Sequence, residues 1–342
     1  MRGQDCSGGQ PRRGLPSGEV SDSRTATGMM QYNFMYEIVT RIGGGPTRTL
    51  PLPRGITRGT VYHYTNSSGL LGILSTSTLW ASSPLSLNDL TEIEYGLDIA
   101  QEVWASWPSR EGLSASQLQV GDSAFESPDS FLPTTDFVYL FCCCSTSDSL
   151  NQWRNYAGGQ GFALGLDVKQ GLTIDPINLP SDPTFPQYFL PGWYAVVYDP
   201  TRQREHVADL IRFVFDMIDE GDRALTNLVA LLRFGVLSLA AQFKHPAFHA
   251  EEEVRFIACT DSSFSETFRV GPFGLVPYIH LTGRTDEEES FFATKNKPLP
   301  LTDLRLGPVN EQEKGLLLRA TSRLLRAHSY DIPIEPSNIP YR

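Results

Sequence analysis

A histidine interrupts the first clearly patterned stretch of the sequence. His63 lies in TVYHYT, residues 60–65, where aromatic and β-branched residues alternate as in a β-strand. Imidazole titrates near neutral pH and both donates and accepts hydrogen bonds. Tyr64 and Thr65 follow, and Thr65 points to the same side of a strand as His63. The strand either contributes to a small polar site or carries a histidine whose hydrogen bonds are satisfied in the core or at the surface.

A second group of polar and aromatic residues follows the apolar run VYLFCCC. Ser145 begins a hydroxyl-rich turn that can cap a short helix predicted over SLNQWRNYAGG, residues 149–159. In that helix Trp153 and Tyr156 are three residues apart, so they are predicted to share one face. They form either part of the core or an aromatic wall on which a flat heterocycle stacks.

Two carboxylates and an arginine alternate in FHAEEEVRF. Glu251, Glu253 and Arg255 share a face if residues 251–260 form a strand. An ion-pair ladder accounts for this pattern without any further role. If the strand faces a cleft, one glutamate is placed for acid/base or electrostatic work, and Arg255 sets its charge state.

Short strands and isolated helices must position these residues. Further strands are predicted at TLWAS, DFVYLFCCCS, GFALGLD, WYAVVY and LVPYIHL, and helices at NDLTEIEYG, residues 202–243 and residues 310–328. The regular β-α alternation of a doubly wound sheet is missing, and neither G-x-G-x-x-G nor a P-loop motif occurs. The predicted class is α+β.

Composition bounds the organisation of the chain. Residues 1–58 are polar and rich in Gly and Pro, and we predict a poorly ordered N-terminal tail. Residues 59–342 are predicted to form one α+β domain with a mobile insertion near 109–135, a segment rich in Ser, Asp and Pro. With no signal-peptide core and no apolar run of about 20 residues, the expected location is the cytoplasm.

Charge and cysteine content exclude several classes of site. The net charge of −11 argues against broad binding of a nucleic-acid backbone. The cysteines lack the paired spacing of a zinc site, and consecutive cysteines in a strand alternate between its faces. We therefore expect core thiols and no metal.

Several of these stretches together resemble the bacterial DUF2971 family. They are VYHYTNSSGLLGILSTSTLW with the following LNDLTEIEYG, CSTSDSLNQWRNYAGGQGFALGLD, FKHPAFHAEEEVRF, LRLGP and DIPIEPSNIPYR. The resemblance covers residues 60–342.

The opening strand, short helix and second strand are also similar to the start of ADP-ribosyltransferase folds, including DNA-modifying toxins. This likeness implies a split, mixed or antiparallel β-sheet core with peripheral helices. It implies NAD as substrate, with His63 on the adenosine ribose and Tyr156 or Trp153 stacked on nicotinamide. Glu253, or else Glu251, would stabilise the oxocarbenium-like transition state.

The same likeness assigns the remaining binding residues. Tyr64, Thr65 and Ser145 would line the NAD site. Arg154, Arg255 and the turn Gly158–Gly161 are the candidates to bind the pyrophosphate. The implied protein is an NAD-dependent ADP-ribosyltransferase-like enzyme, a bacterial toxin or phage-defence effector acting on a protein or nucleic-acid acceptor, with a defence-system or antitoxin partner. The alternatives are an NAD glycohydrolase and a non-catalytic sensor or interaction module.

Overall fold

The computed structural model describes residues 50–84, 91–108, 110–126, 131, 138–158, 160–178, 192–219, 224–260, 264–271, 274–284 and 297–340. Its helices are α2 Ser67–Thr76, α3 Thr91–Ala105, η2 Arg110–Gly112, α4 Ala115–Ala124, α6 Leu150–Asn155, η4 Pro176–Asn178, α7 Pro200–Asp219, α8 Leu225–Ala240, η5 Pro246–Glu251 and α9 Glu311–Ala327. Its strands are β1 Thr60–Thr65, β2 Leu79–Ser82, β3 Val138–Cys144, β4 Phe162–Asp167, β5 Leu172–Ile174, β6 Gly192–Ala195, β7 Glu253–Cys259, β8 Thr267–Gly271, β9 Gly274–Gly283, β10 Leu301–Leu306 and β11 Ile334–Pro336.

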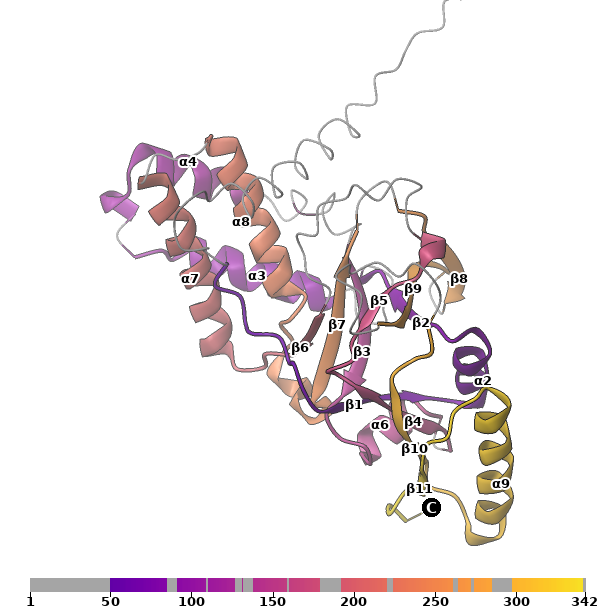
Figure 1. Ribbon diagram of the computed structural model, residues 1–342. Coiled ribbons are helices and arrows are strands. Elements are labelled where there is room, and N and C mark those ends of the chain that lie inside the picture. The colour runs from indigo at the N-terminus through magenta and orange to yellow at the C-terminus, as the bar shows by residue number, and fades with distance from the viewer. Residues whose placement is uncertain are drawn as a thin grey trace, which may run out of the picture.

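All of these strands join one mixed sheet, shown in Figure 1. The order is β11-β10-β4-β1-β3-β2-β9-β5, with β7 pairing β3 and β6, and β8 pairing β9. Among the described strand pairs only β10 and β11 run parallel. The predicted mixture of helices with a large, mostly antiparallel sheet is confirmed.

The sheet splits along one edge of β3. The other edge of β3 pairs with β7 along the whole strand. On the split edge, β2 pairs at Leu140 through Ser82, and β1 pairs at Cys144 through Tyr62. The two contacts are four residues apart, roughly 13 Å at about 3.3 Å per residue. A gap therefore opens between β1 and β2 over the middle of β3.

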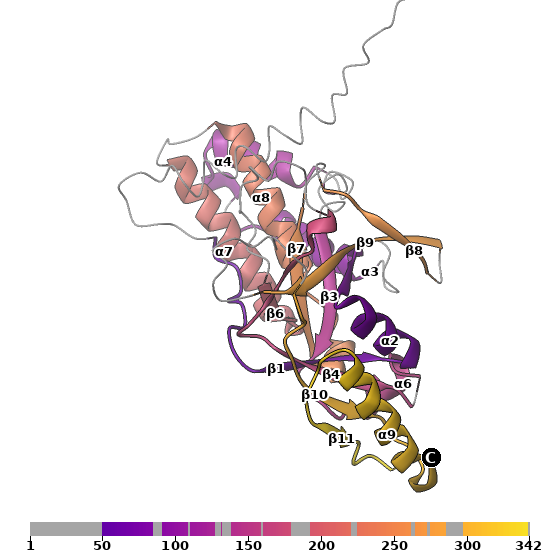
Figure 2. The same ribbon diagram turned by 45° about the vertical axis from the view of Figure 1, so that its right-hand side comes forward.

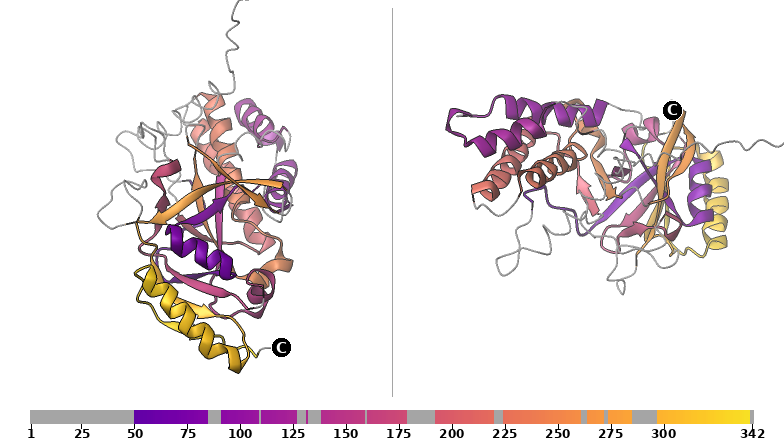
Figure 3. Two further views of the ribbon diagram at one scale, coloured as in Figure 1. Left: turned by 90° about the vertical axis from the view of Figure 1, so that its right-hand side faces the viewer. Right: turned by 90° about the horizontal axis from the view of Figure 1, so that it is seen from above.

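One face of the sheet is covered by the helical layer formed by α3, α4, α7 and α8 (Figures 1 and 3). A buried apolar cluster joins these helices to Leu140 of β3 and Ile257 of β7. Gly96 lets α3 approach α8 closely, since a Cβ there would lie 2.5 Å from Cα of Ala240. The helical layer packs against Ile257 of β7, on the same face of the strand as Glu253 and Arg255.

The opposite face packs against α2 and α9. Leu70 and Leu74 of α2 and Leu325 of α9 belong to a second buried cluster with alternate residues of β3 and β7. Asn66 caps the start of α2, where its side chain accepts a 2.9 Å hydrogen bond from the backbone N–H of Gly69. The apolar faces seen in the sequence thus define both layers.

Part of the predicted insertion at 109–135 is helical. Ser114 and Gln117 form a capping box at the start of α4. Val120 and Ala124 of α4 are buried within the helical layer, so packing here prevails over the polar composition. Residues 109, 127–130 and 132–135 lie outside the described residues.

The end of the predicted N-terminal tail is also packed. The N–H of Ile56 donates a 2.7 Å hydrogen bond to the carbonyl of Trp193 in β6. Leu50 and Leu52 pack against the helical layer. Packed structure, predicted to begin at residue 59, therefore extends back to Leu50. Residues 1–49 lie outside the described residues.

Candidate functional site

A cavity of about 420 Å³ opens at the split between β1 and β2. Its walls include His63 of β1, Trp80 of β2 and Cys142 of β3, with Tyr156 after α6 and Glu251 of η5. A cavity of this volume is in the range of small-molecule sites in proteins. Five segments that are distant in sequence meet here because the sheet splits.

His63 bridges the gap in the sheet. Its Nδ1 lies 3.0 Å from the carbonyl oxygen of Cys142. Because a carbonyl only accepts, Nδ1 carries the proton and Nε2 is left as an acceptor. Burial lowers the pKa of His63, so the ring is neutral at pH 7. His63 therefore satisfies a main-chain group at the split and presents a neutral imidazole to the cavity.

The two predicted stacking aromatics do not share a face. Trp153 is 1% exposed and packs edge-on against Tyr64, with ring centroids 4.6 Å apart. Tyr156 is 46% exposed and lines the cavity. The helix ends at Asn155, so the three-residue spacing rule does not extend to Tyr156, which is the C-cap. Trp153 is a core residue, and Tyr156 is the aromatic residue open to a ligand.

The carboxylate of Asp148 stabilises the segment that carries Trp153 and Tyr156 through hydrogen bonds. Asp148 Oδ1 accepts hydrogen bonds from Trp153 Nε1 at 2.8 Å and from Ser337 Oγ at 2.6 Å. Its Oδ2 accepts the backbone N–H of Asn338 at 2.8 Å. The segment after β11 is thereby attached to the helix that positions Tyr156.

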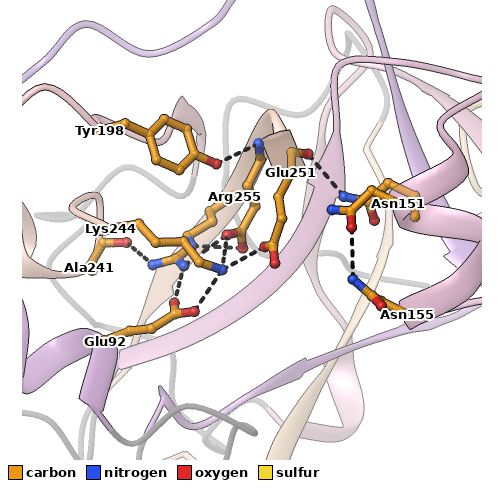
Figure 4. A network of polar contacts seen from close by, with 10 residues as sticks. Glu92, Asn151, Asn155, Tyr198, Ala241, Lys244, Glu251 and Arg255 are labelled. Atoms are coloured by element: carbon orange, nitrogen blue, oxygen red, sulfur yellow. Dashed lines mark hydrogen bonds and ion pairs between the residues drawn. The ribbon is translucent and has the colours of Figure 1, made fainter. Parts of the chain in front are cut away.

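Five charged side chains, from α3, the segment after α8, η5 and β7, form a buried cluster (Figure 4). Lys244 Nζ lies 2.7 Å from Glu92, 2.7 Å from Glu251 and 3.1 Å from Glu253. Arg255 binds both oxygens of Glu253, at 2.9 and 3.0 Å, and also pairs with Glu92. The remaining guanidinium nitrogen donates to the carbonyl of Ala241 at 2.9 Å.

The cluster favours the charged forms of Glu253 and Lys244. Burial opposes the charged form of Glu253, but Arg255 and Lys244 outweigh it and lower the pKa of this carboxyl to about 2. Burial likewise opposes the charged form of Lys244, and its carboxylate neighbours, led by Glu253 and Glu92, raise its pKa well above the usual value. Three carboxylates and two cations leave one negative charge uncompensated beside the cavity.

Glu251 and Glu253 occupy different backbone environments. The strand begins at Glu253, while Glu251 ends the 3-10 helix η5. Glu252 between them has a φ of 46°, so the alternation predicted for residues 251–255 holds for Glu253 and Arg255 and is wrong for Glu251. Both glutamates still line the cavity. Glu253 has both oxygens bound by cations, whereas Oε1 of Glu251 has no hydrogen-bond partner among the described residues.

A further cation lines the β2 side of the cavity. Arg269 of β8 donates from Nη2 to Ser82 Oγ at 3.2 Å, and its guanidinium carbon lies 6.0 Å from the centre of the Trp80 ring. Trp80 is 46% exposed and packs against Tyr278 at 4.8 Å. The guanidinium of Arg269 therefore lies over the indole of Trp80 at the cavity wall, at the outer limit of a cation–π contact.

Comparison with known proteins finds a similarity to a family. A family model described as "Protein of unknown function (DUF2971)" matches residues 152–256. This segment of the chain is therefore similar to the DUF2971 family. The family predicted from the sequence is confirmed over this stretch, and the wider resemblance over residues 60–342 stays a prediction. No curated protein and no solved structure matches the chain significantly.

The segment that matches the family model supplies much of the site. It contains Tyr156, Lys244, Glu251, Glu253 and Arg255. The other walls, on β1, β2 and β8, come from sequence on either side of it.

Several residues predicted for NAD binding lie away from the cavity. Thr65 lies against Gly69 of α2, and Ser145 Oγ donates to Glu252 at 3.2 Å. Arg154 is exposed on α6 and does not line the cavity. Arg255 is 1% exposed and its guanidinium is occupied by the cluster, so it cannot also meet a pyrophosphate. Tyr64 lines the cavity, but its hydroxyl is bonded to the backbone of Thr146 and Ser149.

Sequence reasoning missed four residues at the cavity: Glu92, Lys244, Trp80 and Arg269. The first three lie within the stretches LNDLTEIEYG, FKHPAFHAEEEVRF and TLWAS that the sequence singles out. The fourth stands in a segment without a motif. A charge in an otherwise apolar stretch was the available signal for Lys244.

Two further properties concern only the part of the chain that the structure describes. No group of three or more His, Cys, Asp or Glu residues there is arranged to hold a metal ion. None of its helices combines the length and apolar character needed to cross a membrane.

Proposed function

We propose that the cavity binds NAD and that this protein is an ADP-ribosyltransferase-like enzyme. One observation carries the proposal: a neutral histidine, an open aromatic ring and a pair of carboxylates, from three distant segments, line a single cavity. The split sheet that creates this cavity also agrees with the likeness of the opening strands to ADP-ribosyltransferase folds.

His63 would orient the substrate. Its Nε2 is an acceptor because Nδ1 donates to Cys142. A ribose hydroxyl can donate to this nitrogen without any change of protonation near pH 7. Tyr156 offers a partly exposed ring on which the nicotinamide ring can stack.

Glu251 is the carboxylate that this geometry favours for catalysis. Cleavage of the C1′–N1 bond sends the electron pair to the nicotinamide ring, which leaves neutral, while positive charge develops on the ribose. A fixed carboxylate next to that ribose stabilises the charge, most strongly where water is excluded. Glu251 has an oxygen free to do this, whereas both oxygens of Glu253 are held by Arg255 and Lys244. An acceptor nucleophile then bonds to C1′ and loses its proton.

Turnover of doubly labelled NAD tests the proposal. The protein is incubated with a cell lysate and NAD labelled separately in its nicotinamide and adenylate halves. We expect release of nicotinamide and transfer of the adenylate label to a macromolecule. Glu251→Gln should lower turnover by about 10²-fold or more. Glu205→Gln, a change of the same kind on the exposed side of α7, should leave turnover unchanged.

The same assay separates the competing functions. Free ADP-ribose without labelled macromolecule would identify an NAD glycohydrolase. No consumption of NAD with any lysate would refute the enzymatic proposal and leave a sensor or interaction module. A role as a toxin or phage-defence effector follows only if transfer is seen and if expression arrests cells carrying the wild-type protein but not Glu251→Gln.

A further inference from the structure

Arg269 is a cation without a counter-charge at the wall of the cavity. Within the described residues it makes no ion pair, and its one hydrogen bond goes to Ser82. Its Nε is buried and has no partner. Arg255, by contrast, has its guanidinium fully engaged by Glu92, Glu253 and a carbonyl. A buried donor left unpaired is costly, so a group that supplies acceptors to Arg269 would be stabilised there.

The hairpin of β8 and β9 directs Arg269 toward the cavity. Arg269 faces Val276 across the hairpin, and both line the cavity. The neighbours on either side of Arg269, Phe268 and Val270, are 56% and 85% exposed and point away, as strand alternation requires. Figure 2 shows this hairpin projecting from the rest of the sheet.

Trp80 provides a flat surface next to this cation. Its indole is 46% exposed although it packs against Tyr278. Exposed indoles bind nucleobases by stacking. An arginine fork is the preferred protein partner of a phosphate. The two side chains together match a base that carries a phosphate.

We propose that Trp80, Arg269 and Ser82 form a nucleotide subsite, with the base on Trp80 and the phosphate on Arg269. Ser82 pairs with Leu140 of β3, whereas Glu253 pairs with Cys144, four residues or roughly 13 Å further along that strand at about 3.3 Å per residue, so the subsite lies toward the other end of the cavity from Glu253. The source of the nucleotide rests on the proposed function: it is either the adenylate half of NAD or a nucleotide of the acceptor.

Calorimetric titration of the full chain with adenosine 5′-monophosphate, adenosine and inorganic phosphate tests the subsite. We expect adenosine 5′-monophosphate to bind more tightly than either fragment. Arg269→Gln should weaken its binding by about ten- to a hundredfold, as expected for hydrogen bonds to a charged group, and leave adenosine unaffected. Trp80→Leu should weaken both by about tenfold. Arg204→Gln, on the exposed side of α7, is the matched control.

The outcomes separate this subsite from the enzymatic proposal. Glu251→Gln should bind adenosine 5′-monophosphate normally even where turnover is lost. Competition between NAD and adenosine 5′-monophosphate identifies the subsite with the adenylate half of NAD, and simultaneous binding identifies it with an acceptor nucleotide. Equal affinity of wild type and a folded Arg269→Gln, or no binding to the wild type, would overturn the subsite. Arg269→Lys keeps the charge without the fork and should recover only part of the affinity.

Discussion

Replacing Glu253 by Gln should destabilise the protein in a pH-dependent way. Glu253 is 8% exposed and is held by Arg255 at 2.9 Å and Lys244 at 3.1 Å. These partners lower the pKa of its carboxyl from the usual 4.5 to about 2. At 1.36 kcal/mol for each pKa unit, the charged form contributes roughly 3 kcal/mol to the free energy of unfolding at pH 7. Gln keeps the shape and removes the charge.

The sign of the pH dependence follows from the lowered pKa. The folded protein binds the proton more weakly than the unfolded chain, so this contribution is complete above about pH 4.5. It is lost as the pH falls toward 2. The wild type and Glu253→Gln should therefore differ by roughly 3 kcal/mol at pH 7, and the difference should shrink by about 1 kcal/mol between pH 5 and pH 3.5.

Urea unfolding at pH 7, 5, 4 and 3.5 measures this difference directly. Glu102→Gln is the control, because Glu102 pairs with Arg204 at 2.9 Å on the exposed surface of the helical layer. Such a pair is worth less than about 1 kcal/mol. A Glu253→Gln protein as stable as the control, or a difference that does not change with pH, would refute the coupling between Glu253 and the two cations.

Three further outcomes are expected. Trp153→Leu should lower the free energy of unfolding by about 3 kcal/mol, because it leaves a cavity in the core. Tyr156→Leu should change the free energy of unfolding by less than about 0.5 kcal/mol and should weaken NAD binding. Thermal melting measures the first effect and titration with NAD the second. Gly96→Ala should lower the free energy of unfolding by about 1–3 kcal/mol, because its Cβ would collide with Ala240. Urea unfolding measures this against Gly72→Ala, where the added Cβ meets open space, and equal stability of the two variants would contradict the prediction. Asp148→Asn should release the segment at Ser337, seen as faster proteolysis there with little change in the midpoint of global unfolding.

The sequence predicts which segments form helices and strands better than it predicts which of these elements pack against one another. Strand alternation placed Glu253 and Arg255 on one face of β7, and the structure confirms this pairing. Alternation failed at Glu251, because a left-handed backbone at Glu252 separates it from the strand. The helix α4 was missed because its apolar side is short, and the capping box at Ser114 was not recognised.

The site residues that belong to recognisable sequence motifs could be predicted. His63, Tyr156 and Glu251 stand in recognisable stretches and do meet in one cavity. Lys244 and Arg269 were not predicted, because their roles arise from contacts between elements far apart in sequence. Pairing across a split sheet is set by packing of whole layers, which no local pattern encodes.

The bond between Asp148 and Ser337 has a consequence for the timing of synthesis. Its partners are 189 residues apart. At about 5–20 residues per second, a ribosome needs roughly 10–40 s to make that stretch. During this interval the helix before Tyr156 lacks the hydrogen bond that connects it to Ser337, and β4 lacks its pairing partner β10. In a nascent chain the helix that positions Tyr156 would therefore stay without this attachment until Ser337 has been made.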